Sequence, residues 1–175
     1  MNEARACSAK TLNLMRLDVV AVGHMRGTSE EALITAHSAR ALKAGRQMGF
    51  DGPHVTEVKE RKGTSGAAKQ KEESLLLENA LDQRKGLIAM LDESGKTMTS
   101  RDFAKQLKNW QETGAPQVSF VIGGADGLSD TLRQRSDYML SLGTMTWPHM
   151  LARALLCEQL WRAISILGNH PYHRD

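Results

Sequence analysis

The sequence predicts a single α/β domain in which a mostly parallel β-sheet carries helices on both faces. Two observations lead to this prediction. Short runs rich in Val, Ile and Leu, each stopped by a glycine or a turn, alternate along the chain with longer segments of helical periodicity. The chain also has 175 residues, of which 41% are hydrophobic, and this length and composition suit one domain with a sizeable core.

The first half of the chain begins with a strand and a helix. The Val-rich run at residues 17–23 stops at a glycine, which suits a strand buried on both faces. The following helix is expected to begin with a capping box formed by Thr28 and Glu31, and to end before Gly49. After a turn that contains glycine and proline, the alternating residues 54–58 predict a partly exposed second strand.

A basic stretch that contains two glycines, residues 59–66, is expected to form a mobile loop. It leads into a helix at about residues 67–85, and the consecutive leucines at 75–77 are expected to supply the buried side of that helix. A third strand is expected at residues 87–92, followed by a turn at 93–96.

The next helix is expected to begin with Ser100 as its cap. Its apolar stripe consists of Phe103, Leu107 and Trp110, and it ends at a glycine and a proline before a strand at residues 118–122. Because Trp110 lies on this stripe and Trp161 lies on the apolar stripe of a later helix, we expect both in the core or at an interface and not as platforms for stacking bases.

Three further segments complete the predicted pattern. A helix is expected at about residues 129–140, and the short segment 142–147 suits either a strand or a loop. Pro148 fits the first turn of a last long helix that ends near Gly168. Cys157 lies within that helix and is expected to be a small buried apolar residue, because the two cysteines of the chain make neither a disulfide framework nor a zinc site.

Composition and motifs exclude several classes of protein. The first 20 residues lack the apolar region of a signal peptide and no run of about 18 apolar residues occurs, which indicates a soluble, cytoplasmic protein with no membrane partner. The sequence contains no dinucleotide fingerprint, P-loop, His-Glu-x-x-His or Gly-x-Ser-x-Gly motif. It therefore predicts no bound metal, and it does not support zinc hydrolase or serine esterase chemistry.

The glycine loop, residues 123–127, is the clearest candidate for a ligand-binding loop. It has the form Gly-Gly-x-x-Gly and follows a predicted strand directly. Its glycines allow close approach of the main chain to a ligand, and ligands of parallel sheets bind beyond the carboxyl ends of the strands. Taken alone, the motif fits a nucleotide-like ligand and a merely tight turn equally well.

Groups that transfer protons or bind phosphate are concentrated in the last 27 residues. Imidazole acts as base or acid near neutral pH, arginine clamps phosphate, and tyrosine offers stacking and a hydroxyl. These groups are His149, Arg153, His170, Tyr172, His173 and Arg174. A solvated terminus is the alternative, but a proline and an aromatic residue among the cations favour a tail that docks.

The positive charge of the chain is unevenly distributed. Residues 1–72 hold 12 basic and 8 acidic side chains, whereas residues 73–175 hold 11 and 12. Much of the surplus lies in one stretch, with Lys59, Arg61, Lys62, Lys69 and Lys71. Such a stretch suits the phosphates of a nucleic acid, although on the residues alone a solvated face is the simpler interpretation.

Five segments carry a resemblance to a known family: Val19-Val-Ala-Val-Gly23, Leu91-Asp92 with Gly95-Lys96, Ile122-Gly-Gly-Ala-Asp-Gly-Leu128, Trp147-Pro-His-Met-Leu-Ala-Arg153 and Asn169-His-Pro-Tyr-His-Arg174. In this order they closely resemble the RlmH (YbeA-type) ribosomal RNA methyltransferases of the SPOUT superfamily. The resemblance covers residues 15–175, and the terminal motif is highly specific to that family. Members often have Pro-Glu in place of Ala125-Asp126 and a different segment at 142–147, so the side-chain role of Trp147 is open.

The resemblance implies a SPOUT-type fold whose C-terminal part is threaded as a trefoil knot and holds S-adenosylmethionine. It implies a homodimer that methylates N3 of a pseudouridine in the 23S ribosomal RNA of the assembled ribosome. A SPOUT enzyme with a different target nucleotide and a non-catalytic RNA-binding module are the alternatives. Residues 1–14 lie outside the resemblance and are expected to be a disordered extension or the product of a misplaced start codon, which leaves residues 15–175 as the single domain.

The resemblance also implies roles for particular residues. The residues expected to contact the cofactor are Leu91, Gly123, Gly124, Leu142, Gly143, Thr144, Met145, Thr146 and Trp147. The residues expected to surround the target base and its phosphate are His149, Tyr172, His173 and Arg174, with the tail completing the pocket of the partner subunit. The residues expected to contact RNA are Lys59, Arg61, Lys62 and Arg153. Which group removes the proton of the base is left open.

Overall fold

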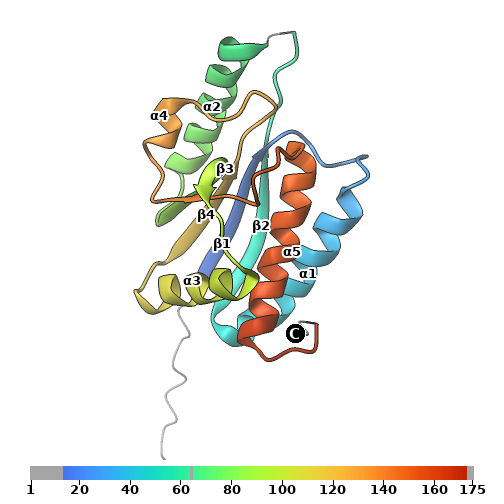
Figure 1. Cartoon of the computed structure of the whole chain (residues 1–175), viewed down its shortest axis with the longest axis vertical. Coiled ribbons are helices and arrows are strands. Elements are labelled where there is room, and N and C mark those ends of the chain that lie inside the picture. Colours follow the sequence, from blue (N-terminus) through green and yellow to red (C-terminus); the bar gives the residue numbers. More distant parts are fainter. Residues whose placement is uncertain (1–13, 64, 173–175) are drawn as a thin grey trace, which may run out of the picture.

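A computed structural model describes residues 14–63 and 65–172 of the chain as one parallel sheet with helices on both faces (Figure 1). The strands are β1 (Met15–Val22), β2 (Phe50–Val58), β3 (Leu87–Lys96), β4 (Gln117–Ile122) and β5 (Tyr138–Leu140), in the spatial order β2-β1-β4-β3-β5. The helices are α1 (Glu31–Gly45), η1 (Arg46–Met48), α2 (Gly66–Asp82), α3 (Ser100–Glu112), α4 (Asp130–Arg133) and α5 (His149–Leu167). The predicted α/β fold is confirmed.

The interior strand β1 contributes to both layers of the core because its side chains alternate between the faces of the sheet. Leu17, Val19 and Ala21 belong to the larger apolar cluster, which α1, α3 and α5 cover. Val20 and Val22 belong to the smaller cluster with the buried leucines of α2 and α4. Helices therefore cover both faces of β1, as its continuous apolar run predicts.

Helix α5 is the most deeply buried helix of the larger layer, and it packs against both α1 and α3. Cys157 is fully buried in it, and burial raises the pKa of the Cys157 thiol to about 11. The thiol is therefore protonated at neutral pH, which suits the predicted apolar role. Trp110 and Trp161 are also buried, so their predicted place in the core is confirmed.

Two strands are longer than the sequence predicts. The expected turn at 50–53 is the first part of β2, which pairs with β1 from Phe50 onward. The expected turn at 93–96 is the end of β3, where Lys96 pairs with Leu140 after an irregular register. A Cβ atom at Gly95 would lie 2.7 Å from the main chain of Leu140. Gly95 therefore marks a close approach of β3 and β5. The prediction of a turn at this glycine is wrong.

The expected helix at 129–140 is wrong in length and partly wrong in type. Only the four residues of α4 are helical, and residues 138–140 form the edge strand β5. The Asp137 carboxylate accepts a hydrogen bond of 2.8 Å from the Ile88 N–H, and the Asp137 N–H donates to the Ile88 carbonyl at 2.9 Å. These long-range bonds fix the segment beside β3, and local sequence periodicity does not report them.

Helix boundaries and buried faces also differ in detail from the prediction. Helix α1 begins at Glu31 without a side-chain cap, and the Thr28 hydroxyl instead donates to the Met25 carbonyl. Helix α3 is capped by Thr99, one residue before the predicted cap. Of the three consecutive leucines of α2, only Leu77 is buried, because a helix turns 100° per residue and buries one face.

Two expectations about the whole chain stay predictions. The trefoil knot is one of them. The other is the disordered extension at residues 1–14, of which 1–13 lie outside the described residues. Within the described part, none of the helices is both long enough and apolar enough to cross a membrane.

Candidate active site

A cavity of about 470 Å³ lies beyond the carboxyl end of β4 and beside the second half of β3, at the edge of the sheet where parallel sheets bind their ligands. Its walls come from the end of β3, the glycine loop, the segment 141–147 and the start of α5. The sequence-predicted residues that line it are Leu91, Gly123, Gly124, Leu142, Gly143, Met145, Thr146, Trp147 and His149. Thr144 is not among the lining residues. The structure thus brings together eight of the nine predicted cofactor contacts.

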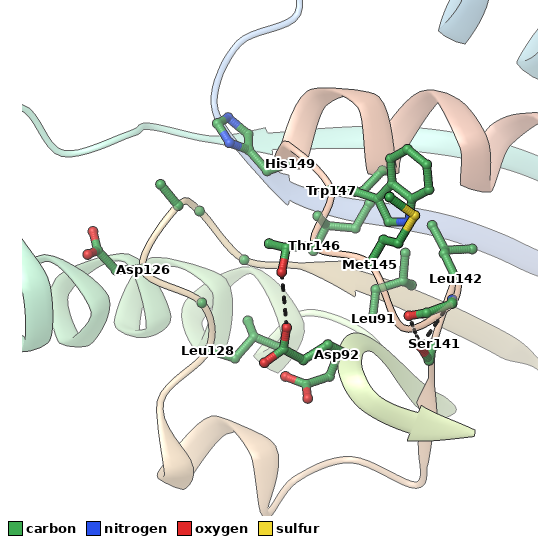
Figure 2. A pocket seen from close by; sticks show the side chains of 18 of the residues that line it. Leu91, Asp92, Asp126, Leu128, Ser141, Leu142, Met145, Thr146, Trp147 and His149 are labelled. Atoms are coloured by element: carbon green, nitrogen blue, oxygen red, sulfur yellow. Dashed lines mark hydrogen bonds between the residues drawn. The ribbon is translucent and has the colours of Figure 1, made fainter. Parts of the chain in front are cut away.

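The segment 141–147 forms one wall of the cavity and is a loop, so the choice between strand and loop is resolved (Figure 2). The Ser141 hydroxyl bonds both the carbonyl and the N–H of Gly143, at 2.8 and 3.2 Å. Thr146 donates to the Glu93 carboxylate at 3.3 Å. Met145 and Trp147 remain 68% and 38% exposed, so large apolar side chains stand at the mouth of the cavity.

The glycine loop follows β4 as a tight turn in which the Gly127 N–H donates to the Gly124 carbonyl at 3.0 Å. A Cβ atom at Gly124 would overlap the carboxylate of Glu73, which lies behind the loop on α2. Glycine is therefore required at position 124 by packing, and the same absence of a side chain leaves the main chain open to the cavity. The two interpretations of this motif, a ligand-binding loop and a tight turn, are therefore compatible.

An ion pair between Asp92 and Arg133 lies at the edge of the cavity. The sequence did not predict this pair. Arg133 approaches the Asp92 carboxylate at 2.8 Å, and the Asp92 side chain is only 7% exposed. Burial would raise the pKa of Asp92, but hydrogen bonds from Ser94 and the charge of Arg133 together hold this pKa below its ordinary value. Asp92 directly follows the apolar run at residues 87–91 of β3, and a carboxylate in that place was the available signal.

His149 begins α5 and lies at the opposite side of the cavity from Leu91 and Met145 (Figure 2). Its pKa is lowered, mainly because burial disfavours the charged imidazole. Glu60 and Glu73 oppose this shift, while Arg153 and Lys69 add to it. The imidazole is therefore neutral at pH 7 and has a nitrogen lone pair that accepts a proton.

Arg153 does not lie where an RNA contact requires it. Its side chain is fully buried and donates to the Glu57 carboxylate at 2.8 Å and to the carbonyls of Val22 and Gly23 at 2.7 and 2.8 Å. These bonds tie α5 to the ends of β1 and β2. The expected RNA contact of Arg153 is corrected to a structural role, because its hydrogen bonds point into the protein.

Replacing Arg153 with Ala is expected to lower the free energy of unfolding by about 3–5 kcal/mol, because it removes the donor to the carbonyls of Val22 and Gly23 and the buried cation that pairs with Glu57. Urea denaturation followed by circular dichroism measures this change. The exposed Arg26 provides a matched control, and Arg26→Ala is expected to stay within about 0.5 kcal/mol of the parent. Equal stability of both variants would contradict the structural role.

The basic loop, residues 59–63, lies near His149, since the pKa of Glu60 in this loop is lowered by the hydrogen bond from Lys69 and, to a smaller degree, by the charge of His149. Lys59, Arg61 and Lys62 are exposed, as an RNA contact requires, although Arg61 pairs with Glu72 at 3.3 Å. Lys69 differs, since it is mostly buried and pairs with Glu60 at 3.0 Å. The cations that the structure leaves exposed to phosphate are therefore those of the loop together with Lys71 on α2, whereas Lys69 is held by its ion pair.

Tyr172 lies at the other end of α5 from His149. Its hydroxyl donates to the Glu158 carboxylate at 3.0 Å, and its ring packs against Trp161. A helix of 19 residues is roughly 28 Å long. One subunit therefore does not bring Tyr172 to its own cavity. His173 and Arg174 lie outside the described residues.

Among the described residues, no group of three or more His, Cys, Asp or Glu side chains is arranged to hold a metal ion.

The chain matches a family model described as "Predicted SPOUT methyltransferase" over residues 15–173. Similar curated proteins carry the name "Ribosomal RNA large subunit methyltransferase H". One from Roseobacter denitrificans is 44% identical over 162 residues, which cover 92% of this chain and all of the relative. One from Allorhizobium ampelinum is 41% identical over 161 residues, with coverage of 92% and 100%. A solved "probable methylase family protein" from Haemophilus influenzae Rd KW20 matches 94% of this chain and 72% of its own, at a TM-score of 0.49 and 13% identity.

Proposed function

Since this chain belongs to the SPOUT methyltransferase family, we propose that it is a ribosomal RNA methyltransferase that uses S-adenosylmethionine. We propose more specifically that it methylates N3 of a pseudouridine in the 23S ribosomal RNA of the assembled ribosome, and therefore acts in the cytoplasm. The observation that carries the proposal is the cavity beyond β4 and beside β3, because eight of the nine expected cofactor contacts converge on it from separate parts of the chain.

The lining of the cavity fits S-adenosylmethionine in size and chemistry. Its volume of about 470 Å³ falls within the usual range for sites of this kind. The glycine loop and the segment 141–147 offer main-chain groups, while Leu91 and Met145 offer apolar surface. Glu93 places a carboxylate at the edge, where a cationic ligand is favoured, while the charge of Asp92 is balanced by Arg133. When bound, the cofactor supplies a methyl group on a positively charged sulfur.

Methylation of a ring nitrogen requires alignment of the two reactants and removal of the nitrogen's proton. A bound cofactor would supply its methyl group to N3, and its sulfur would keep the electrons of the carbon–sulfur bond. We propose that His149 accepts the proton that N3 loses. Its neutral imidazole lines the cavity, and no other histidine among the described residues does. Arg133 and Asp92 hold each other at the opposite edge and stiffen the wall there.

The separation of His149 and Tyr172 by the length of α5 supports a homodimer as the working unit. If two subunits pair with their α5 helices antiparallel, the tail of each lies beside the cavity of the other. Tyr172, His173 and Arg174 then surround the target base and its phosphate from the partner's side. The exposed Lys59, Arg61 and Lys62 contact further phosphates of the RNA.

Primer extension on ribosomes tests the proposal directly, because a methyl group on N3 blocks base pairing and stops reverse transcriptase. Ribosomes from a strain that lacks the gene are expected to lose one stop in 23S ribosomal RNA. Adding the purified protein and S-adenosylmethionine to them is expected to restore it. An unchanged stop in the deletion strain would contradict the proposed target. Loss of a stop at another nucleotide would favour the alternative of a different target.

Calorimetry with S-adenosylmethionine separates the enzyme from the non-catalytic RNA-binding module. The enzyme is expected to bind the cofactor with one site per subunit. Absence of binding would contradict the methyltransferase proposal.

A further inference from the structure

The first half of helix α2 holds the segment that forms one wall of the cavity. The Gln70 side-chain amide donates to the carbonyls of Asp126 and Leu128, at 2.9 and 3.2 Å. One turn later, the Ser74 hydroxyl accepts a hydrogen bond of 3.0 Å from the Ser129 N–H. Residues four apart lie on one face of a helix. This face of α2 therefore fixes the glycine loop and the two residues that follow it.

The same part of α2 also holds the basic loop. The Glu73 carboxylate accepts a hydrogen bond of 2.9 Å from the Arg61 N–H through its Oε1 atom. Lys69 pairs with Glu60 at 3.0 Å, and Glu72 pairs with the Arg61 side chain at 3.3 Å. One helix thus contacts both the loop proposed to bind RNA and the loop proposed to bind the cofactor.

Glu73 connects the two loops through a single side chain. It is 1% exposed, and its second oxygen, Oε2, is buried without a hydrogen-bond partner among the described residues. A Cβ atom at Gly124 would overlap this oxygen, so the main chain of the glycine loop rests directly on the carboxylate. A buried unsatisfied carboxylate oxygen opposes folding. The proposed chemistry does not use Glu73, so its place between the loops calls for another explanation.

We propose that Gln70 and Glu73 are positioning residues that couple RNA binding at the basic loop to cofactor binding at the glycine loop. This inference rests on the proposed function. Phosphates that fix the basic loop also fix the Arg61 main chain, and with it the Glu73 carboxylate on which Gly124 rests. The glycine loop then has less conformational freedom to lose when the cofactor binds. Because coupling between binding sites is reciprocal, a bound cofactor tightens RNA binding by the same factor.

Equilibrium dialysis with S-adenosylhomocysteine tests the coupling, since this product occupies the cofactor site without reacting. Its Kd is measured for the full-length protein alone and with saturating ribosomes from the deletion strain. The ratio of the two values is expected to be about five or more for the parent protein. It is expected to approach one for Gln70→Ala and for Glu73→Ala. Glu78→Gln, on the same helix beyond these contacts, is expected to keep the parent ratio.

A purely structural role would not change this ratio, because a loss of folded protein lowers the number of sites and leaves the two Kd values in proportion. Glu73→Gln is a second variant in case Glu73→Ala does not fold, and it is expected to lower the ratio less because it keeps the acceptor for the Arg61 N–H. A parent ratio of one, or parent ratios in both Gln70→Ala and a folded Glu73 variant, would overturn the coupling. Absence of any S-adenosylhomocysteine binding by the parent would instead overturn the proposed function.

Discussion

Deleting residues 171–175 is expected to abolish methylation of ribosomes while leaving the affinity for S-adenosylmethionine unchanged. The deletion removes Tyr172 together with His173 and Arg174, the groups proposed to hold the target base and its phosphate. None of the described residues that line the cavity belongs to the deleted segment. Arg174→Ala is the point variant with the same expectation. Methyl incorporation into ribosomes and calorimetry with the cofactor measure the two effects separately.

Mixed dimers show whether the tail acts on its own subunit or on the partner. One subunit carries His149→Ala and the other carries Arg174→Ala, and two affinity tags isolate dimers with one of each. If the tail completes the partner's cavity, one site of every mixed dimer is intact, and about half of the parent activity is expected. If the tail acts within its own subunit, both sites are defective. Inactive mixed dimers would contradict the exchange of tails, as would full activity of the tail deletion.

Replacing His149 with Gln is expected to lower kcat by about 10²–10⁴-fold, the usual contribution of a general base. Glutamine keeps a polar side chain in the wall of the cavity but does not accept the proton of N3. The affinity for S-adenosylmethionine is expected to change much less than kcat. His54, which pairs with Asp51 on β2, provides the control, and His54→Gln is expected to retain the parent rate.

The pH profile of the parent enzyme checks the same role. Only the neutral imidazole accepts a proton, so kcat/KM falls as pH drops through the pKa of His149. Burial lowers that pKa below its ordinary value of about 6.5. The acid limb of the profile is therefore expected to have its midpoint below pH 6.5, with a level rate from there through pH 7. A midpoint above 6.5, or an unchanged rate in His149→Gln, would contradict the assignment.

Elements with a strong apolar pattern were predicted correctly from the sequence. The Val-rich run of β1, the stripe of Phe103, Leu107 and Trp110 on α3, and the long helix α5 all occur where they were expected. In these elements, the position of a residue within its own strand or helix decides whether its side chain faces the water or the core. The periodicity of the sequence therefore predicts them. The prediction for residues 138–140 is wrong because this strand depends on the bonds between Asp137 and Ile88, which are 49 residues apart in the sequence.

The candidate site was likewise predicted only in part. The glycine loop was predicted from its own motif, and the segment 142–147 was predicted from the resemblance to the family. The ion pair of Asp92 and Arg133, the burial of Arg153 and the place of Glu73 behind Gly124 were not predicted. Each depends on side chains that meet across separate elements, and no local pattern in the sequence reports such a meeting.

The sequence by itself determined the α/β class, the family resemblance and the segments that line the cavity, because these follow from periodicity and short motifs. Only the tertiary structure decided which charged groups are available to bind a ligand. Arg153 and Lys69 are as basic in the sequence as Arg61, yet burial and ion pairs commit them to holding the fold. The physical reason is that the ability of a charge to meet a partner depends on its surroundings in space, and the order of residues does not specify those surroundings.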